Sequence, residues 1–256
     1  MSRAHYLYFP SCLLGLTGLL LAACEAPQPL TPSRESAGSL AEGAVGAYDS
    51  RVARQKAAIR VLCFGDSFTF GTTQRGLPGL ATLSPIEGYL PKLAGLLESE
   101  LDDDFTLVNS GLGGEDTSEG LARLPAELRI YNPDLVLLWL GVVDVNTTEK
   151  ARFTLARNNL TAMMRMIKSH GAQVVIGTYP AMNPDGFRAL APEHIPRLNS
   201  VIRQEANAEQ VSIAGHERAF GDDLTLIGTD GLHPNDNGYR VIAETWFEAI
   251  RELRFR

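Results

Sequence analysis

Ser67 lies in the heptapeptide Gly-Asp-Ser-Phe-Thr-Phe-Gly, directly after a run of apolar residues. A serine at a tight, glycine-flanked turn from a strand into a helix is held in the open, and the helix N-terminus favours negative charge beside it. Such a position suits a nucleophile. The tripeptide is also typical of a serine that caps a helix, so taken alone it leaves both interpretations open.

Asp230 and His233 lie near the other end of the chain, in the segment Thr-Asp-Gly-Leu-His-Pro-Asn. An acyl-transfer serine needs a base to take its proton, and the base needs an acceptor on its other ring nitrogen. On one short loop, Asp230 can reach Nδ1 of His233 while Nε2 faces Ser67. The segment is also good turn chemistry, so a structural role is the alternative.

Short β-rich runs alternate with longer stretches of helical periodicity, which indicates repeated βαβ units. The expected strands cover residues 59–64, 105–109, 135–140, 173–177 and 211–213. The expected helices cover residues 87–101, 118–130, 150–170, 195–209 and 236–253. We therefore predict an α/β domain over residues 58–256, a doubly wound, flavodoxin-like three-layer α/β/α fold with about five mostly parallel strands. Ligands are expected at the carboxyl ends of those strands.

Three segments together resemble the SGNH hydrolases, also called GDSL-type esterases and lipases. They are residues 65–71, 109–117 (Asn-Ser-Gly-Leu-Gly-Gly-Glu-Asp-Thr) and 230–234, in the family's order. The resemblance implies that Ser67 is the nucleophile, that His233 is the general base and then acid, and that Asp230 orients His233. It also implies an oxyanion hole made by the backbone N–H groups of Ser67 and Gly111, and no metal or cofactor.

The segment Gly-Val-Val-Asp-Val-Asn at residues 141–146 departs from the family pattern Gly-x-Asn-Asp, because Val143 replaces the asparagine that donates to the oxyanion. Losing one such donor costs about 100- to 1,000-fold in turnover. Three interpretations compete. Asn146 takes the vacated place, although as a cap of the following helix it has an ordinary structural role that we favour. Alternatively the enzyme works with two donors, or the domain is an inactive scaffold.

The first 24 residues carry one basic and no acidic side chain around an apolar stretch too short to span a bilayer. The end of this stretch, Leu-Ala-Ala-Cys24, resembles the lipobox of bacterial lipoproteins, with an ordinary secretory signal as the alternative. The resemblance implies a signal peptide at residues 1–23, and a lipidated Cys24 that begins a flexible tether over residues 24–57. The protein is then exported and lipid-anchored to the bacterial cell envelope. Glu25 favours the outer membrane if the cell is Gram-negative.

The composition excludes several classes of protein and of binding partner. The chain has 256 residues, a net charge of −7, 45% hydrophobic residues and three cysteines, which exclude a disulfide-stapled scaffold and a disordered chain. The acidic balance argues against nucleic acid as a partner. Cys63, inside an apolar run, is expected to be a buried, unreactive thiol.

Two loops, residues 72–85 and 181–192, are expected to border the substrate cleft. Neither offers a continuous apolar surface for a long acyl chain. The predicted function is therefore hydrolysis of short acyl esters, such as acetyl groups on envelope carbohydrate. The alternative is a catalytically weak or inactive lipoprotein that binds an acylated or glycan ligand. Arg75 and Arg188 either meet an anionic substrate or are ordinary solvated arginines, which is the commoner case.

Overall fold

The computed structural model describes residues 5–7, 57–73, 82–83, 87–146 and 149–255. Its sheet has the order β1-β5-β2-β6-β7-β8, and every neighbouring pair is parallel. The strands are β1 (His5–Leu7), β2 (Ile59–Gly65), β5 (Phe105–Gly111), β6 (Leu135–Trp139), β7 (Gln173–Gly177) and β8 (Ser212–Ala214). Apart from β1, the second strand along the chain lies outside the first and the others follow in sequence. This is the flavodoxin-like order, and it confirms the predicted fold.

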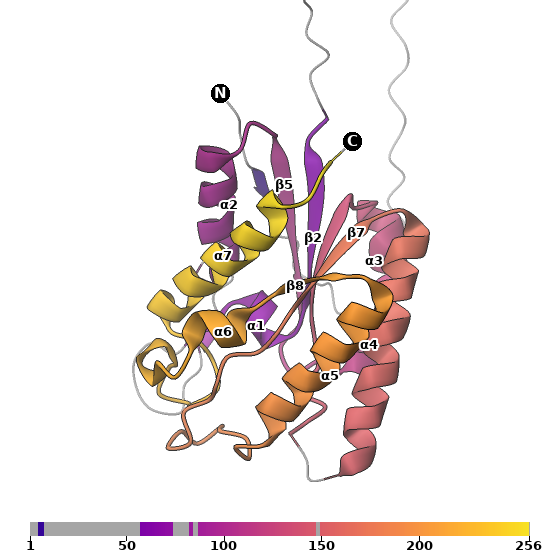
Figure 1. Cartoon of the computed structure of the whole chain (residues 1–256). Helices are drawn as coiled ribbons and strands as arrows, with labels where there is room; N and C mark the ends of the chain where they lie inside the picture. Colours follow the sequence, from indigo (N-terminus) through magenta and orange to yellow (C-terminus); the bar gives the residue numbers. More distant parts are fainter. Residues whose placement is uncertain (1–4, 8–56, 74–81, 84–86, 147–148, 256) are drawn as a thin grey trace, which may run out of the picture. The chain divides into compact units, whose positions relative to one another are not determined.

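Helices cover the sheet on both sides (Figure 1). Helices α2 and α7 pack together on one side, while α3, α4 and α5 form a row on the other. The helices are α1 (Ser67–Phe70), α2 (Tyr89–Glu100), α3 (Thr117–Tyr131), α4 (Lys150–His170), α5 (His194–Glu209), α6 (His216–Phe220) and α7 (Asp236–Arg251). Minor elements are β3 (Thr72–Thr73), β4 (Thr82–Leu83) and the 3-10 turn η1 (Leu224–Leu226). The five long helices were predicted with ends correct to about two residues.

The apolar periodicity of the sequence corresponds to observed burial. All five residues of β6 are buried, as expected for a central strand covered on both faces. On α7 one face is buried, comprising Gly238, Tyr239, Ile242, Ala243, Trp246, Phe247 and Ile250. Cys63 is fully buried, and this burial raises its pKa to about 12, so the thiol stays protonated and unreactive at neutral pH.

The N-terminal predictions fall mostly outside the described residues. Residues 5–7 of the predicted signal peptide form β1, which pairs with Thr106–Val108 of β5. Cys24 and the predicted tether up to residue 56 lie outside the described part of the chain. In the part that is described, no helix is both long and apolar enough to cross a bilayer.

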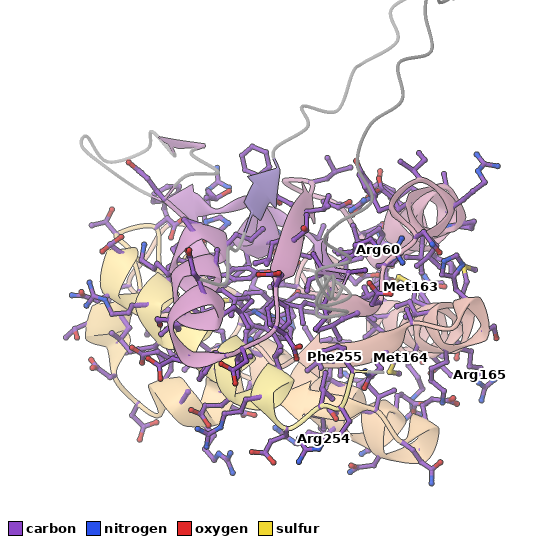
Figure 2. The ribbon with its side chains drawn as sticks, turned by 90° about the horizontal axis from the view of Figure 1, so that it is seen from above. Arg60, Met163, Met164, Arg165, Arg254 and Phe255 are labelled. Atoms are coloured by element: carbon purple, nitrogen blue, oxygen red, sulfur yellow. The ribbon has the colours of Figure 1, made fainter. Side chains whose placement is uncertain are left out.

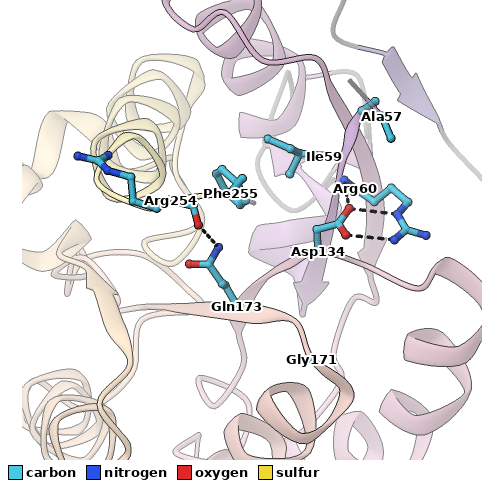
Figure 3. Close-up of a pocket in the computed structure, with 9 residues that line it drawn as sticks. Ala57, Ile59, Arg60, Asp134, Gly171, Gln173, Arg254 and Phe255 are labelled. Atoms are coloured by element: carbon cyan, nitrogen blue, oxygen red, sulfur yellow. Dashed lines mark hydrogen bonds and ion pairs between the residues drawn. The ribbon is translucent and has the colours of Figure 1, made fainter. Parts of the chain in front are cut away.

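A cavity of about 920 Å³ opens at the end of the sheet where β2 begins. Figure 2 views this end, on which Arg60, Arg254 and Phe255 lie. Arg60 pairs with Asp134 through two side-chain hydrogen bonds of 3.1 Å (Figure 3). Gln173 donates to the carbonyl of Arg254 across the cavity. The residues lining it are Ala57, Ala58, Ile59, Arg60, Asp134, Gly171, Gln173, Arg254 and Phe255, which include no nucleophile or general base of the predicted kind.

Candidate active site

Ser67, His233 and Asp230 form a hydrogen-bonded chain at the opposite, carboxyl end of the sheet. His233 Nε2 lies 2.8 Å from Ser67 Oγ, and His233 Nδ1 lies 2.6 Å from Asp230 Oδ2. A carboxylate can only accept, so Nδ1 carries the proton and Nε2 accepts from the serine hydroxyl. The structure thus brings together the three predicted residues, two of which lie 166 positions apart.

Local hydrogen bonds keep Asp230 ionised. Its Oδ1 accepts from the backbone N–H groups of Leu232 and His233, both at 2.9 Å. Burial by itself raises the pKa of Asp230, but the hydrogen bond from the His233 ring and these two N–H groups bring it below its usual range. Gly231 has φ +82°, a left-handed conformation that glycine adopts without strain, and it lets the loop turn back between the two side chains.

The turn that presents Ser67 is capped by its neighbour Asp66. The Asp66 carboxylate accepts from the N–H of Phe68 at 3.0 Å and from the hydroxyl of Tyr179 at 2.7 Å. The first N–H groups of a helix have no partner within the helix. At the start of α1, Asp66 accepts from the N–H of Phe68, and the N–H of Ser67 is left without a partner in the helix. Burial raises the pKa of Asp66 to about 7.

A cavity of about 460 Å³ lies over the Ser67 and His233 side chains. Its lining is mostly apolar or backbone, as in small-molecule sites generally. The lining residues are Ser67, Thr72, Gly113, Gly114, Val142, Val143, Asn146, Arg188, Leu190, Leu232 and His233. The loops after β2 and β7 contribute Thr72, Arg188 and Leu190, which agrees with the predicted borders.

Gly111 does not line this cavity, which differs from the place expected of an oxyanion donor. Its N–H donates to Asn109 Oδ1 at 3.0 Å. A Cβ on Gly111 would overlap the backbone nitrogen of Phe70, which shows that the glycine packs behind α1. Gly113 and Gly114 line the cavity instead, with open space around them.

One sequence signal indicates Gly114. Gly114 lies two residues before Asp116, the N-cap of α3, which forms a capping box with Glu119. In the structure Gly114 has φ +81°. In a doubly wound fold the helix that follows a strand starts at the ligand edge, so the glycines next to that start are better donors than one inside the strand. Gly111 is the last residue of β5.

Asn146 does not cap the following helix, which corrects the interpretation favoured from sequence. Helix α4 begins at Lys150 with Glu149 at its N-cap. Asn146 is exposed and lines the cavity together with Val143. Its side-chain amide makes no hydrogen bond to another described residue, so it is available to a bound substrate.

Arg123 fixes the glycine loop from below. Its guanidinium binds both oxygens of Glu115, at 2.5 and 2.7 Å, and donates to the carbonyl of Ser110 at 2.8 Å. It also lies 3.9 Å from the centre of the Phe64 ring. Glu115 directly follows Gly114, so these contacts tie the loop to the ends of β2 and β5. Sequence patterns did not reveal this network because Arg123 lies inside a helix with ordinary amphipathic spacing.

Comparison with known proteins decides the family. Residues 63–241 match the model of the GDSL-like Lipase/Acylhydrolase family, which is most of the chain. The chain belongs to the GDSL-like lipase/acylhydrolase family. An arylesterase of Vibrio mimicus is 34% identical over 124 residues, covering 48% of this chain and 56% of that protein. Esterase TesA of Pseudomonas aeruginosa is 27% identical over 186 residues, covering 71% of this chain and 82% of TesA. This GDSL-family chain thus spans about half the length of the arylesterase.

Solved structures agree on the fold of the GDSL-family domain. The carbohydrate acetylesterase Est24 of Sinorhizobium meliloti superposes with a TM-score of 0.65 at 19% identity, covering 77% of this chain and all of Est24. Among the described residues, no group of three or more His, Cys, Asp or Glu side chains is arranged to hold a metal ion.

Proposed function

We propose that the protein is a serine esterase in which Ser67 is the nucleophile, His233 the general base and acid, and Asp230 the residue that orients and charges the histidine. The supporting observation is the unbroken hydrogen-bond chain from Ser67 Oγ through the imidazole to Asp230. Membership of the GDSL-like lipase/acylhydrolase family and similarity to named esterases agree with it.

The reaction proceeds in two acyl transfers. Ser67 Oγ attacks the ester carbonyl carbon while His233 Nε2 takes the hydroxyl proton, and the imidazolium is stabilised by ionised Asp230. Collapse of the tetrahedral intermediate breaks the carbon–oxygen bond of the ester, and His233 gives its proton to the departing alcohol. Water, deprotonated by His233, then attacks the acyl-enzyme and releases the acid, with the proton returning to Ser67.

The oxyanion is held by three donors in this proposal. Two are backbone N–H groups, from Ser67 and from the Gly113–Gly114 loop, both at the cavity. The third is the side-chain amide of Asn146, which lines the same cavity where Val143 has no donor to offer. We expect Asn146→Ala to lower kcat by about 100- to 1,000-fold with little change in KM, because oxyanion contacts form in the transition state. An unchanged kcat would show that two backbone donors suffice.

The cavity supports short acyl groups. Its volume is about 460 Å³, and it is shared between acyl and alcohol parts of the substrate. Lipid attachment at Cys24 and residence in the cell envelope complete the proposal and rest on the lipobox-like sequence. Blocking signal peptidase II in cells that express the protein should leave a full-length precursor, and normal processing would contradict the anchor.

The central experiment compares the chain with its Ser67→Ala variant on an aryl acetate such as 4-nitrophenyl acetate. We expect turnover by the parent protein and a loss of about a millionfold in kcat for the variant, close to the background rate. A fluorophosphonate should label the parent and not the variant. Equal rates in both proteins, with no labelling, would favour the alternative of an inactive scaffold that binds its ligand without turnover.

A further inference from the structure

We propose that Arg188 selects esters whose alcohol part carries a carboxylate. This inference rests on the proposed function and names its substrate class. Among the described residues that line the cavity over Ser67, Arg188 is the only one with a permanently charged side chain. In a protein of net charge −7, this cation borders the same cavity as Ser67 and His233.

The Arg188 guanidinium is free to take a ligand. Among the described residues no carboxylate forms an ion pair with it, and its Cζ lies 5.8 Å from the centre of the Phe187 ring. By contrast, several other exposed arginines in the described chain are paired, for example Arg165 with Glu209 and Arg157 with Glu205. The planar guanidinium matches a carboxylate with two parallel hydrogen bonds.

The position of Arg188 is built into the site. Its backbone N–H donates to the carbonyl of Asp230 at 2.8 Å, so the residue is tied directly to the loop of the proposed triad. Asn183 donates to Gly231 in the same way at 3.0 Å. Gly186 packs so closely on Gly231 that a Cβ at either position would overlap the other backbone. These backbone contacts hold the Arg188 loop against the Asp230 loop, whereas an ordinary solvated arginine has no such fixed position relative to a site.

The exposure of Arg188 indicates which half of the substrate carries the charge. The side chain is exposed and therefore lies at the rim of the cavity, while Ser67 is 9% exposed and lies at its base. A short acyl group occupies the buried part of the cavity, next to residues such as Val142, which is 3% exposed. The alcohol part extends toward solvent past the rim, and a carboxylate on it meets the guanidinium.

The test compares two acetate esters that differ in one charge, 4-acetoxybenzoate and its neutral methyl ester. We expect the parent protein to favour the anion by about tenfold in kcat/KM, after correction for spontaneous hydrolysis, and Arg188→Gln to remove that preference. Arg188→Lys, which keeps the charge and loses the planar fork, should retain part of it. Raising the salt concentration should lower the rate for the anion more than for the methyl ester.

Arg197→Gln is the matched control. Arg197 is also exposed and lies 4.0 Å from the centre of a phenylalanine ring, that of Phe153, but it does not line the cavity. Its replacement should leave the ratio of the two rates as in the parent. An equal ratio in parent and Arg188→Gln proteins would overturn the inference.

A binding measurement separates this inference from the proposed function. Calorimetric titration of the Ser67→Ala variant with 4-acetoxybenzoate requires no turnover. We expect binding that weakens about tenfold when Arg188→Gln is added. If the parent turns over neither ester, the proposed function fails, and the titration still decides the role of Arg188. No difference between the single and double variants would overturn it.

Discussion

At the carboxyl edge of the sheet, a cavity of about 460 Å³ covers a serine bound to a histidine bound to a buried carboxylate. At the amino edge, a cavity of about 920 Å³ is lined by an arginine and an aspartate that pair with each other. In the first cavity, the hydrogen bonds run in one direction, from Asp230 through His233 to Ser67 Oγ, the proposed nucleophile. In the second cavity, Arg60 and Asp134 pair with each other, and their side chains are more than 40% exposed. The larger cavity is therefore not the candidate active site, and the hydrogen-bond chain identifies the smaller cavity instead.

The strongest way to break the comparison is to replace Asp230 at the carboxyl edge. Asp230→Asn keeps the size of the side chain but removes the negative charge that, in the proposed mechanism, stabilises the imidazolium and selects the Nδ1–H tautomer. We expect a loss of about ten-thousandfold in kcat, measured on an aryl acetate at neutral pH. The asparagine oxygen can still accept from the N–H groups of Leu232 and His233, so the loop should keep its shape. A loss in kcat below about tenfold would therefore mean that groups other than the Asp230 charge orient His233.

Arg123 tests whether the carboxyl edge depends on its support. Arg123→Lys keeps a charge near Glu115 but cannot make the fork of contacts that holds the glycine loop, so we expect kcat to fall by roughly tenfold to a hundredfold with KM little changed. Arg157→Lys, at a half-exposed pair with Glu205, is the control and should behave as the parent. A change confined to KM would contradict a role in placing the oxyanion donors.

Asp66 makes the carboxyl edge sensitive to pH. Its folded pKa is about 7 because of burial, well above the usual value of 3.8. Between these two pH values Asp66 is ionised in the unfolded chain but still protonated in the folded chain. The free energy of unfolding therefore falls as pH rises through this window. We expect Asp66→Asn to remove this slope, up to about 1.4 kcal/mol per pH unit. Denaturant unfolding of both proteins from pH 4 to pH 7 measures it, and parallel curves would contradict the burial argument.

The smallest effect is expected at the amino edge. Burial raises the pKa of Asp134, but the hydrogen bonds from Arg60 outweigh it and hold the pKa below its usual range. The pair therefore stabilises the fold above the unfolded pKa of the carboxyl, and this stabilisation is lost as pH falls through the folded pKa. Because both side chains are partly exposed, Asp134→Asn should cost less than about 1 kcal/mol and leave kcat/KM unchanged. A loss of activity would show that the two edges are coupled.

Sequence reasoning was most reliable where chemistry and chain spacing coincide. Asp230 and His233 lie three residues apart on one loop, so their contact was predictable from local geometry alone. The strand β6 was predictable because five consecutive apolar residues suit a strand covered on both faces. The short helix α6 was missed because five residues carry too little periodicity to be recognised, and α1 was expected only as a helix start at Ser67, without its length.

The amino-acid sequence by itself determined the fold class, the choice of Ser67, His233 and Asp230 as the candidate triad, and the valine at position 143 where the family pattern has asparagine. Only the tertiary structure decided that Gly111 packs behind α1 while Gly114 reaches the cavity, and that Asn146 lies at the cavity rather than on a helix cap. It also decided that the loop of Arg188 is bonded to that of Asp230. The physical reason is that residue type and periodicity fix local conformation, whereas the direction in which a loop N–H or side chain points depends on packing between segments far apart in the chain.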